Sequence, residues 1–115
     1  MAKLNYLELP VGQVAGARDF YGKAFGWSFT EYGPDYAAAE GGAVAIGLNG
    51  TQDQAIKLLL PLIEVEDLEA ALASVTAAGA AITVPIFAFP GGRRFHFRDP
   101  DGNELGAFVN EPGEA

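Results

Sequence analysis

Residues 95–106, Phe-His-Phe-Arg-Asp-Pro-Asp-Gly-Asn-Glu-Leu-Gly, have the pattern of a strand, a tight turn and a second strand. Pro100 fixes φ in the turn, and Asp99 and Asp101 are able to bond nearby backbone groups. Gly102 tolerates a positive φ, which tight turns often need. Because apolar residues flank the turn on both sides, the stretch predicts a β-hairpin.

Upstream of this hairpin, the chain contains two similar segments, 11–26 and 65–79. In each, a strand ends at a valine and a helix with one buried face follows. Asp67 is predicted to cap the second helix, and Gly26 and Gly79 to end the two helices. The apolar positions with helical spacing are Val14, Ala17, Tyr21 and Ala24 in the first segment and Leu68, Ala71, Leu72, Val75 and Ala78 in the second.

Short apolar segments around the helices predict strands, separated by glycine and proline. The order is strand, helix, three strands, and it occurs twice, which predicts an α+β fold built from two βαβββ modules. We expect one domain over 1–115, with module one at about 1–52 and module two at about 53–115. The predicted strands are 3–9, 27–32, 36–40, 43–48, 56–65, 81–84, 93–98 and 104–109.

The hairpin, the repeat and the sequence Asp19-Phe20-Tyr21 resemble the vicinal oxygen chelate superfamily, which includes glyoxalase I, extradiol dioxygenases and bleomycin-resistance proteins. The resemblance covers nearly the whole chain. It implies two curled sheets that surround a bowl-shaped cleft, with the helices outside. It also implies a homodimer, in which modules of two chains pair.

The metal enzymes of this superfamily bind one divalent ion in the bowl. The resemblance places the four ligand positions at Tyr6, at Ile46 or Gly47, at Leu60 and at Gly106. Leucine and glycine side chains cannot ligate, and tyrosine alone is a poor ligand for such a metal. We therefore expect no metal and no other cofactor.

If the ligand positions are shifted by two residues along their strands, they stay on the same strand face. Glu8 and Glu104 then become candidate metal ligands. Two carboxylates without a histidine form a weak site for a hard cation at best. The alternative that we favour is that both carboxylates line a solvated bowl.

The predicted function is metal-free binding of a small organic molecule, similar to the antibiotic-sequestering branch of the superfamily. The expected ligand-binding residues are Tyr6, Glu8, Tyr36, Leu60, His96 and Gly106, and no catalytic residue is assigned. Gly106 is expected to leave the space that a ligating glutamate fills in metal enzymes. On this hypothesis, Gly106→Glu abolishes ligand binding and leaves the fold intact.

Two other functions stay open. The first is a lyase or dioxygenase-type enzyme that uses an unusual metal site or the single histidine, His96, as a general base. His96 shares a strand face with Arg94 and Arg98, but no carboxylate can be paired with it from the sequence. The second is an interaction protein with a vestigial bowl. Residues 87–90 are interpreted as a lid over the bowl or as a contact with a partner subunit, and residues 91–94 as a hairpin-like connection. Trp27 is interpreted as a core residue.

Composition and charge bear on whether the protein binds nucleic acid, crosses a membrane or is cytoplasmic. The chain has 115 residues, no cysteine and a net charge of −8. The acidic balance argues against nucleic-acid binding, because phosphate backbones are repelled. The longest apolar run, 58–63, is too short to span a bilayer. With no signal peptide recognised and no cysteine, we expect a cytoplasmic protein.

Overall fold

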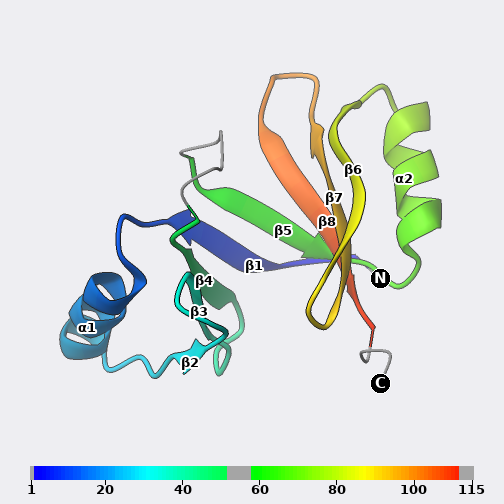
Figure 1. Ribbon diagram of the computed structural model, residues 1–115. Coiled ribbons are helices and arrows are strands. Elements are labelled where there is room, and N and C mark those ends of the chain that lie inside the picture. Colours follow the sequence, from blue (N-terminus) through cyan, green and yellow to red (C-terminus); the bar gives the residue numbers. More distant parts are fainter. Residues whose placement is uncertain (1, 52–57, 112–115) are drawn as a thin grey trace. The chain divides into compact units, whose positions relative to one another are not determined.

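The computed structural model describes residues 2–51 and 58–111, which divide into two compact units (Figure 1). The N-terminal unit comprises Tyr6–Leu60, and the C-terminal unit comprises Pro61–Ala115 together with Met1–Asn5. The predicted boundary between the modules lies near residue 52, in the segment outside the described residues. Each unit is described by itself.

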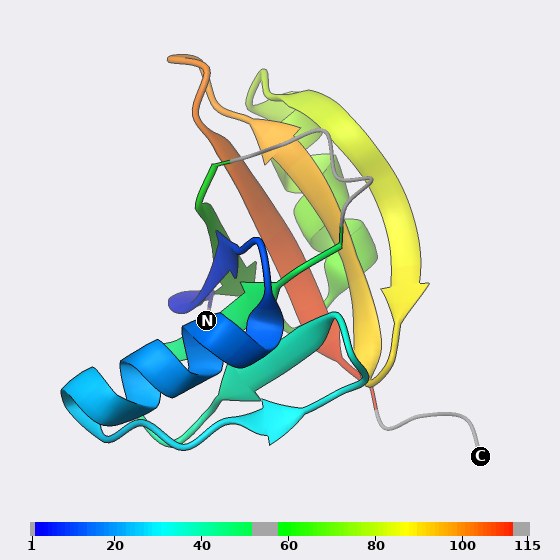
Figure 2. The same cartoon turned by 60° about the vertical axis from the view of Figure 1, so that its left-hand side comes forward.

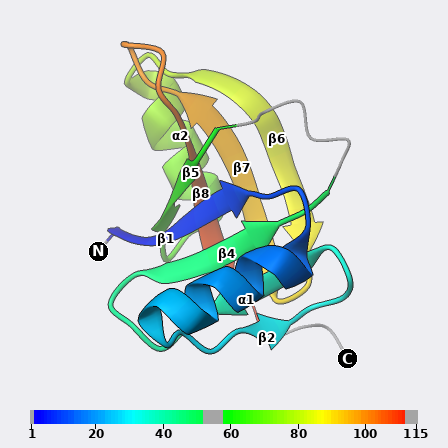
Figure 3. The ribbon, with the colours of Figure 1, turned by 90° about the vertical axis from the view of Figure 1, so that its left-hand side faces the viewer.

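The N-terminal unit contains one sheet with the strand order β2-β3-β4-β1, covered on one face by helix α1 (Figure 3). β1 pairs with β4 in parallel, and the other neighbours are antiparallel. Val14 on the helix packs with Ala37 and Leu48 from the sheet to form the core of this unit. The elements are β1 Lys3–Pro10, α1 Val14–Phe25, β2 Thr30–Glu31, β3 Tyr36–Ala39 and β4 Ala45–Asn49.

The C-terminal unit has the strand order β5-β8-β7-β6, and α2 covers one face of this sheet (Figure 2). β5 and β8 are parallel, whereas β7 is antiparallel to both β8 and β6. Leu68 of α2 packs with Phe95, Phe97, Ala107 and Val109. The elements are β5 Leu60–Glu64, α2 Leu68–Ala77, β6 Ala81–Phe89, β7 Gly92–Arg98 and β8 Glu104–Asn110.

The two units therefore share one topology: a strand, a helix and three strands, in which the first strand is parallel to the last. This confirms the predicted α+β fold of two βαβββ modules. Each helix buries its apolar face against its own sheet, which is why the same apolar spacing occurs twice in the sequence.

Local signals in the sequence placed several turns and caps correctly. The Asp67 side chain accepts a hydrogen bond from the Ala70 amide, and Gly26 ends α1 in the left-handed region at φ 73°. In the predicted hairpin, Asp99 accepts bonds from the Asp101 and Asn103 amides, and Gly102 has φ 89°. The bonds from Asn103 are the main cause that lowers the pKa of Asp99.

Other expectations about the secondary structure were wrong. Residues 87–90 are not a lid loop, because β6 continues to Phe89 and pairs with β7. The hairpin-like connection predicted at 91–94 is confirmed by the turn at Gly91, where φ is 96°. The predicted strand 27–32 is reduced to Thr30–Glu31. Trp27 is 39% exposed, because it stacks on the outside of Tyr21 and Phe25 instead of entering the core.

The expected buried faces of the helices are also shorter than predicted. Ala24 and Ala78 lie exposed near the last turn of each helix. Residues 56–57 of the predicted strand 56–65 lie outside the described residues. Neither of the two described helices is long and apolar enough to cross a membrane.

Candidate functional site

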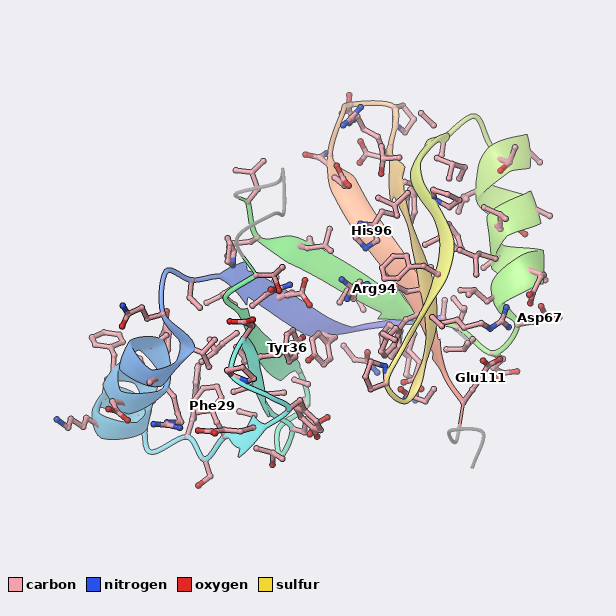
Figure 4. The ribbon with its side chains drawn as sticks, in the orientation of Figure 1. Phe29, Tyr36, Asp67, Arg94, His96 and Glu111 are labelled. Carbon is pink, nitrogen blue, oxygen red and sulfur yellow. The ribbon has the colours of Figure 1, made fainter. Side chains whose placement is uncertain are left out.

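A cluster of polar side chains lies on the face of the N-terminal sheet opposite α1. The strand register aligns Glu8 with Gly47 and Tyr36 with Asn49. Alternation along the strands places these residues and Tyr6 on one face, whereas the α1 side holds Leu48 and Phe29. Figure 4 shows Tyr36 and Phe29 in this unit. We call Tyr6, Glu8, Tyr36 and Asn49 the tyrosine–glutamate cluster.

Hydrogen bonds connect the whole cluster. Tyr36 Oη donates to Glu8 Oε2 at 2.9 Å, and Asn49 Nδ2 donates to Glu8 Oε1 at 3.3 Å. The hydroxyls of Tyr6 and Tyr36 are 2.7 Å apart. Because a phenol has one proton, and Tyr36 gives its proton to Glu8, Tyr6 is the donor in the tyrosine pair. The cluster therefore runs from Tyr6 through Tyr36 to a carboxylate.

The side chains of the tyrosine–glutamate cluster are buried, so their polar atoms must be hydrogen-bonded within the protein. Glu8 is only 4% exposed, and a buried carboxylate is costly unless it is hydrogen-bonded. Burial, followed by the charge of Glu8, raises the pKa of Tyr36 well above the ordinary tyrosine value. Tyr36 therefore stays protonated in the folded protein. Its contribution to stability is present below the unfolded tyrosine pKa and is lost as the pH rises above it.

Gly47 makes this arrangement possible. A Cβ atom at position 47 would lie 2.7 Å from Tyr6 Oη and 2.9 Å from Tyr36 Cζ, and still closer to Tyr36 Oη. The two hydroxyls thus occupy the space directly above Gly47, where a larger residue would place its side chain.

On the C-terminal sheet, His96 and Glu104 lie on the face opposite α2. His96 Nδ1 is 3.6 Å from Glu104 Oε2, and both side chains are nearly buried. Thr83 Oγ1 donates to the same carboxylate at 3.0 Å, and Arg98 Nη2 lies 3.5 Å from it. The sequence alone did not pair His96 with a carboxylate. The register of β7 and β8, which aligns Arg98 with Glu104, brings the two together.

Aromatic rings complete the surroundings of His96. Phe87 contacts the imidazole edge-on, with the ring centres 5.7 Å apart. The Arg94 guanidinium lies over the Phe87 ring at 5.3 Å and over the Phe89 ring at 5.8 Å. Figure 4 shows Arg94 and His96 on the same side of β7, away from α2. This confirms that the two side chains share one strand face.

The space expected above Gly106 is not open. A Cβ atom at position 106 would clash with the Leu62 side chain and lie 3.2 Å from His96 Cδ2. Gly106 pairs with both residues, with Leu62 on β5 and His96 on β7. The expectation of a vacated volume was therefore wrong, because neighbouring side chains fill it.

The positions that resemble metal ligands do not supply a fitting donor set. Ile46 packs into the core on the α1 side, and Leu60 is buried with no donor atom. Gly47 and Gly106 are covered by side chains from neighbouring strands. Tyr6 donates to Tyr36 and is the one candidate oxygen in the set. Within 2–51 and 58–111, no three His, Cys, Asp or Glu side chains gather as a metal-binding group.

Sequence reasoning named three of the four members of the tyrosine–glutamate cluster but missed Asn49. Strand parity was the signal that could have found it, since Asn49 is two residues after Gly47. The interpretation of Glu8 and Glu104 as solvated residues was wrong, because both carboxylates are nearly buried. Leu60 is 6% exposed in the N-terminal unit, and His96 and Gly106 lie in the C-terminal unit.

Comparison with models of known protein families identifies the family of this chain. The model of the Glyoxalase/Bleomycin resistance protein/Dioxygenase superfamily matches residues 3–106. The chain belongs to this superfamily. A search of curated proteins found no significant match.

Several solved structures share the fold of this chain. Methylmalonyl-CoA epimerase from Mycobacterium tuberculosis is 17% identical, with a TM-score of 0.78 over 95% of this chain and 88% of that one. A structure described as NAD-dependent benzaldehyde dehydrogenase from Legionella pneumophila is 18% identical, with a TM-score of 0.77 over 93% and 99%. A superfamily member from Vibrio splendidus 12B01 is 15% identical, with a TM-score of 0.66 over 96% and 100%. At these identities, the likeness concerns the fold alone.

Proposed function

We propose that this superfamily member binds a small organic molecule without a metal ion, and that the tyrosine–glutamate cluster is the polar part of its binding site. The observation that carries the proposal is the hydrogen-bonded set of Tyr6, Tyr36 and Glu8 above Gly47. A few placed polar groups among apolar residues are typical of small-molecule sites. The predicted contacts at Leu60, His96 and Gly106 stay predictions, and this proposal does not depend on them.

The direction of the hydrogen bonds favours one ligand chemistry. Glu8 accepts from Tyr36 and Asn49, and the Tyr6 proton goes to Tyr36. The hydrogen-bonding atoms of Glu8 and Tyr6 in this cluster are therefore oxygens, and the carboxylate of Glu8 is an acceptor only. The proposal favours a ligand with a cationic or hydrogen-bond-donating group over one with a carboxylate.

A thermal-shift screen with amine, amide and carboxylate fragments of similar size tests this proposal. Amines or amides are expected to stabilise the wild type. Tyr36→Phe should weaken their binding about tenfold, or about 1.4 kcal/mol, because it removes the hydroxyl that holds the acceptor oxygens of Glu8 and Tyr6 in place. Tyr32→Phe is the matched control, because the Tyr32 hydroxyl is exposed and bonded to Glu40. Fragments that stabilise all three proteins equally would place the site elsewhere, and the absence of any hit would refute the proposal.

Metal content is a second, independent prediction. Because Leu60 and the two covered glycines offer no donor atoms, no first-row metal is expected to bind tightly. Protein exposed to Zn, Ni or Fe(II) and then gel-filtered should contain well under one ion per chain by elemental analysis. A near-stoichiometric content that also raises the melting temperature would contradict the metal-free proposal.

The enzyme alternative, a lyase or dioxygenase-type activity, is favoured by one observation, the contact between His96 and Glu104. A carboxylate beside Nδ1 fixes the orientation of an imidazole, as general-base catalysis requires. However, both ring nitrogens of His96 are shielded from solvent. The contact between His96 and Glu104 is therefore also consistent with a purely structural role. Metal-free binding is therefore the function that we put forward. A cytoplasmic location remains part of the proposal.

A further inference from the structure

The hydrogen bonds of the tyrosine–glutamate cluster form a chain with one fixed end. The backbone amide of Thr51 donates to Asn49 Oδ1 at 2.9 Å, which fixes the orientation of the Asn49 side chain, because a reversed amide would place two N–H groups against each other. Asn49 Nδ2 therefore faces Glu8 and donates to Oε1 at 3.3 Å. Since this N–H group only donates, Glu8 Oε1 stays an acceptor whatever the charge of the carboxyl group.

The rest of the chain is reversible. A hydroxyl group both donates and accepts, and its hydrogen rotates to suit its neighbours. Tyr36 Oη lies 2.9 Å from Glu8 Oε2 and 2.7 Å from Tyr6 Oη, so each of these two links can hold its proton on either oxygen. Because Asn49 donates to Oε1, a proton that Glu8 takes up is held on Oε2, beside Tyr36. The two links then run in the opposite direction.

We infer that the protonation state of Glu8 sets the direction of this hydroxyl chain and thereby the ligand chemistry that the cluster prefers. When Glu8 is ionised, Tyr36 donates to Glu8 and Tyr6 donates to Tyr36, so the Tyr6 oxygen suits a ligand that donates. When Glu8 is neutral, its Oε2 donates to Tyr36 and Tyr36 donates to Tyr6. The Tyr6 proton then leaves the pair and suits a ligand that accepts. The direction of the chain follows from the geometry alone, whereas the ligand preference rests on the proposed function.

Glu8 is the member of the chain that gains or loses the proton. Two titratable groups face it, Tyr36 from β3 and Tyr6 from its own strand, and β4 contributes Asn49, which does not titrate. Burial, followed by the charge of Glu8, raises the pKa of Tyr36, so this phenol keeps its proton. Tyr36 therefore transmits the change of direction without becoming ionised.

Glu8→Gln tests the direction of the chain, because the new amide has the hydrogen-bonding pattern of a neutral carboxyl group. Its oxygen accepts from Asn49, and its N–H group donates to Tyr36. In protein with isotope-labelled tyrosine Cζ atoms, the NMR signal of Tyr6 is expected to move, because its hydroxyl changes from donor to acceptor within the pair. In a Tyr36→Phe background, Glu8→Gln should move the Tyr6 signal far less, since the chain is cut.

The wild type allows the same test without a substitution at Glu8. With the Glu8 Cδ atom labelled as well, lowering the pH is expected to move the Glu8 and Tyr6 signals together, because one proton changes both. Two separate titrations would contradict the coupling. Glu40→Gln is the matched control, since Glu40 accepts from the exposed Tyr32 hydroxyl at 2.7 Å, and it should leave the Tyr6 signal in place.

The ligand preference is measured with indole, whose ring nitrogen donates, and quinoline, whose ring nitrogen accepts. Both are uncharged at neutral pH, so the lost charge of Glu8 has little direct effect on their binding. In Glu8→Gln, the dissociation constant of quinoline relative to that of indole is expected to fall about tenfold, because the hydrogen bond at Tyr6 is reversed. Glu40→Gln should leave this ratio unchanged.

The possible failures have different meanings. A Tyr6 signal that Glu8→Gln leaves in place, or moves equally in the Tyr36→Phe background, would overturn the inferred chain. A Tyr6 signal that moves as expected, in a protein that binds neither indole nor quinoline, would support the chain and count against the proposed function at this cluster. An unchanged ratio with both compounds bound would overturn the link between chain direction and ligand preference.

Discussion

Gly106→Glu is expected to destabilise the protein by about 3 kcal/mol or more, and so to lower the melting temperature by roughly 10 °C or more. The new Cβ atom would clash with Leu62, which is 2% exposed, and would press against the His96 ring. The new carboxyl group would then lie beside the apolar Leu62 side chain, where an unpaired charge is costly. The sequence alone predicted that Gly106→Glu leaves the fold intact. The structure instead predicts a loss of stability.

Thermal or urea denaturation measures this effect, and Gly41→Glu is the matched control. Gly41 is exposed, and a Cβ at that position meets nothing within 4 Å. The control should lie within about 0.5 kcal/mol of the wild type. If Gly106→Glu and Gly41→Glu have the same melting temperature, Leu62 does not fill the space above Gly106.

A double-mutant cycle identifies the clash itself. Leu62→Ala alone should cost about 2–5 kcal/mol, because it opens a cavity. Combined with Gly106→Ala, the total is expected to be smaller than the sum of the two single effects, because the new methyl group occupies part of that cavity. Strict additivity would contradict contact between the two positions.

Gly47→Ala is expected to have the second large effect, a loss of about 2–4 kcal/mol. The added methyl group takes the place of the Tyr36 hydroxyl and forces it away from Glu8. A buried carboxylate then loses a donor, and under the proposed function the fragments that bind at the cluster lose affinity as well. Denaturation and the thermal-shift screen measure the two consequences separately.

Gly12→Ala provides the control for this substitution. Its Cβ would meet no atom within 4 Å, and its φ is not positive, so stability should change by no more than about 0.5 kcal/mol. A Gly47→Ala variant as stable as this control would show that the two hydroxyls do not lie above Gly47.

The sequence by itself determined the features that depend on neighbours along the chain. Asp99, Gly102 and Asn103 form the hairpin turn with bonds that span four residues or fewer, so the turn chemistry was sufficient to predict it. Helical spacing identified both helices, because each buries one apolar stripe against its own sheet. Repetition of this pattern predicted an α+β protein with two similar halves, and the resemblance to the superfamily implied how two βαβββ modules are built.

Strand alternation, also local, placed Arg94 and His96 on one face. Alternation gives the face of a residue, but it does not give the contents of the space above it. That space depends on which strands become neighbours and in which register.

Only the tertiary structure decided how the candidate site is filled. Glu8 meets Asn49 across 41 residues, and Tyr6 meets Tyr36 across 30, through pairing of strands that no local pattern fixes. The same holds for Leu62 above Gly106 and for Glu104 beside His96. The sequence therefore determined the family and the missing metal ligands. The register between distant strands determined which side chains occupy those positions, because packing in a sheet is set by neighbours in space.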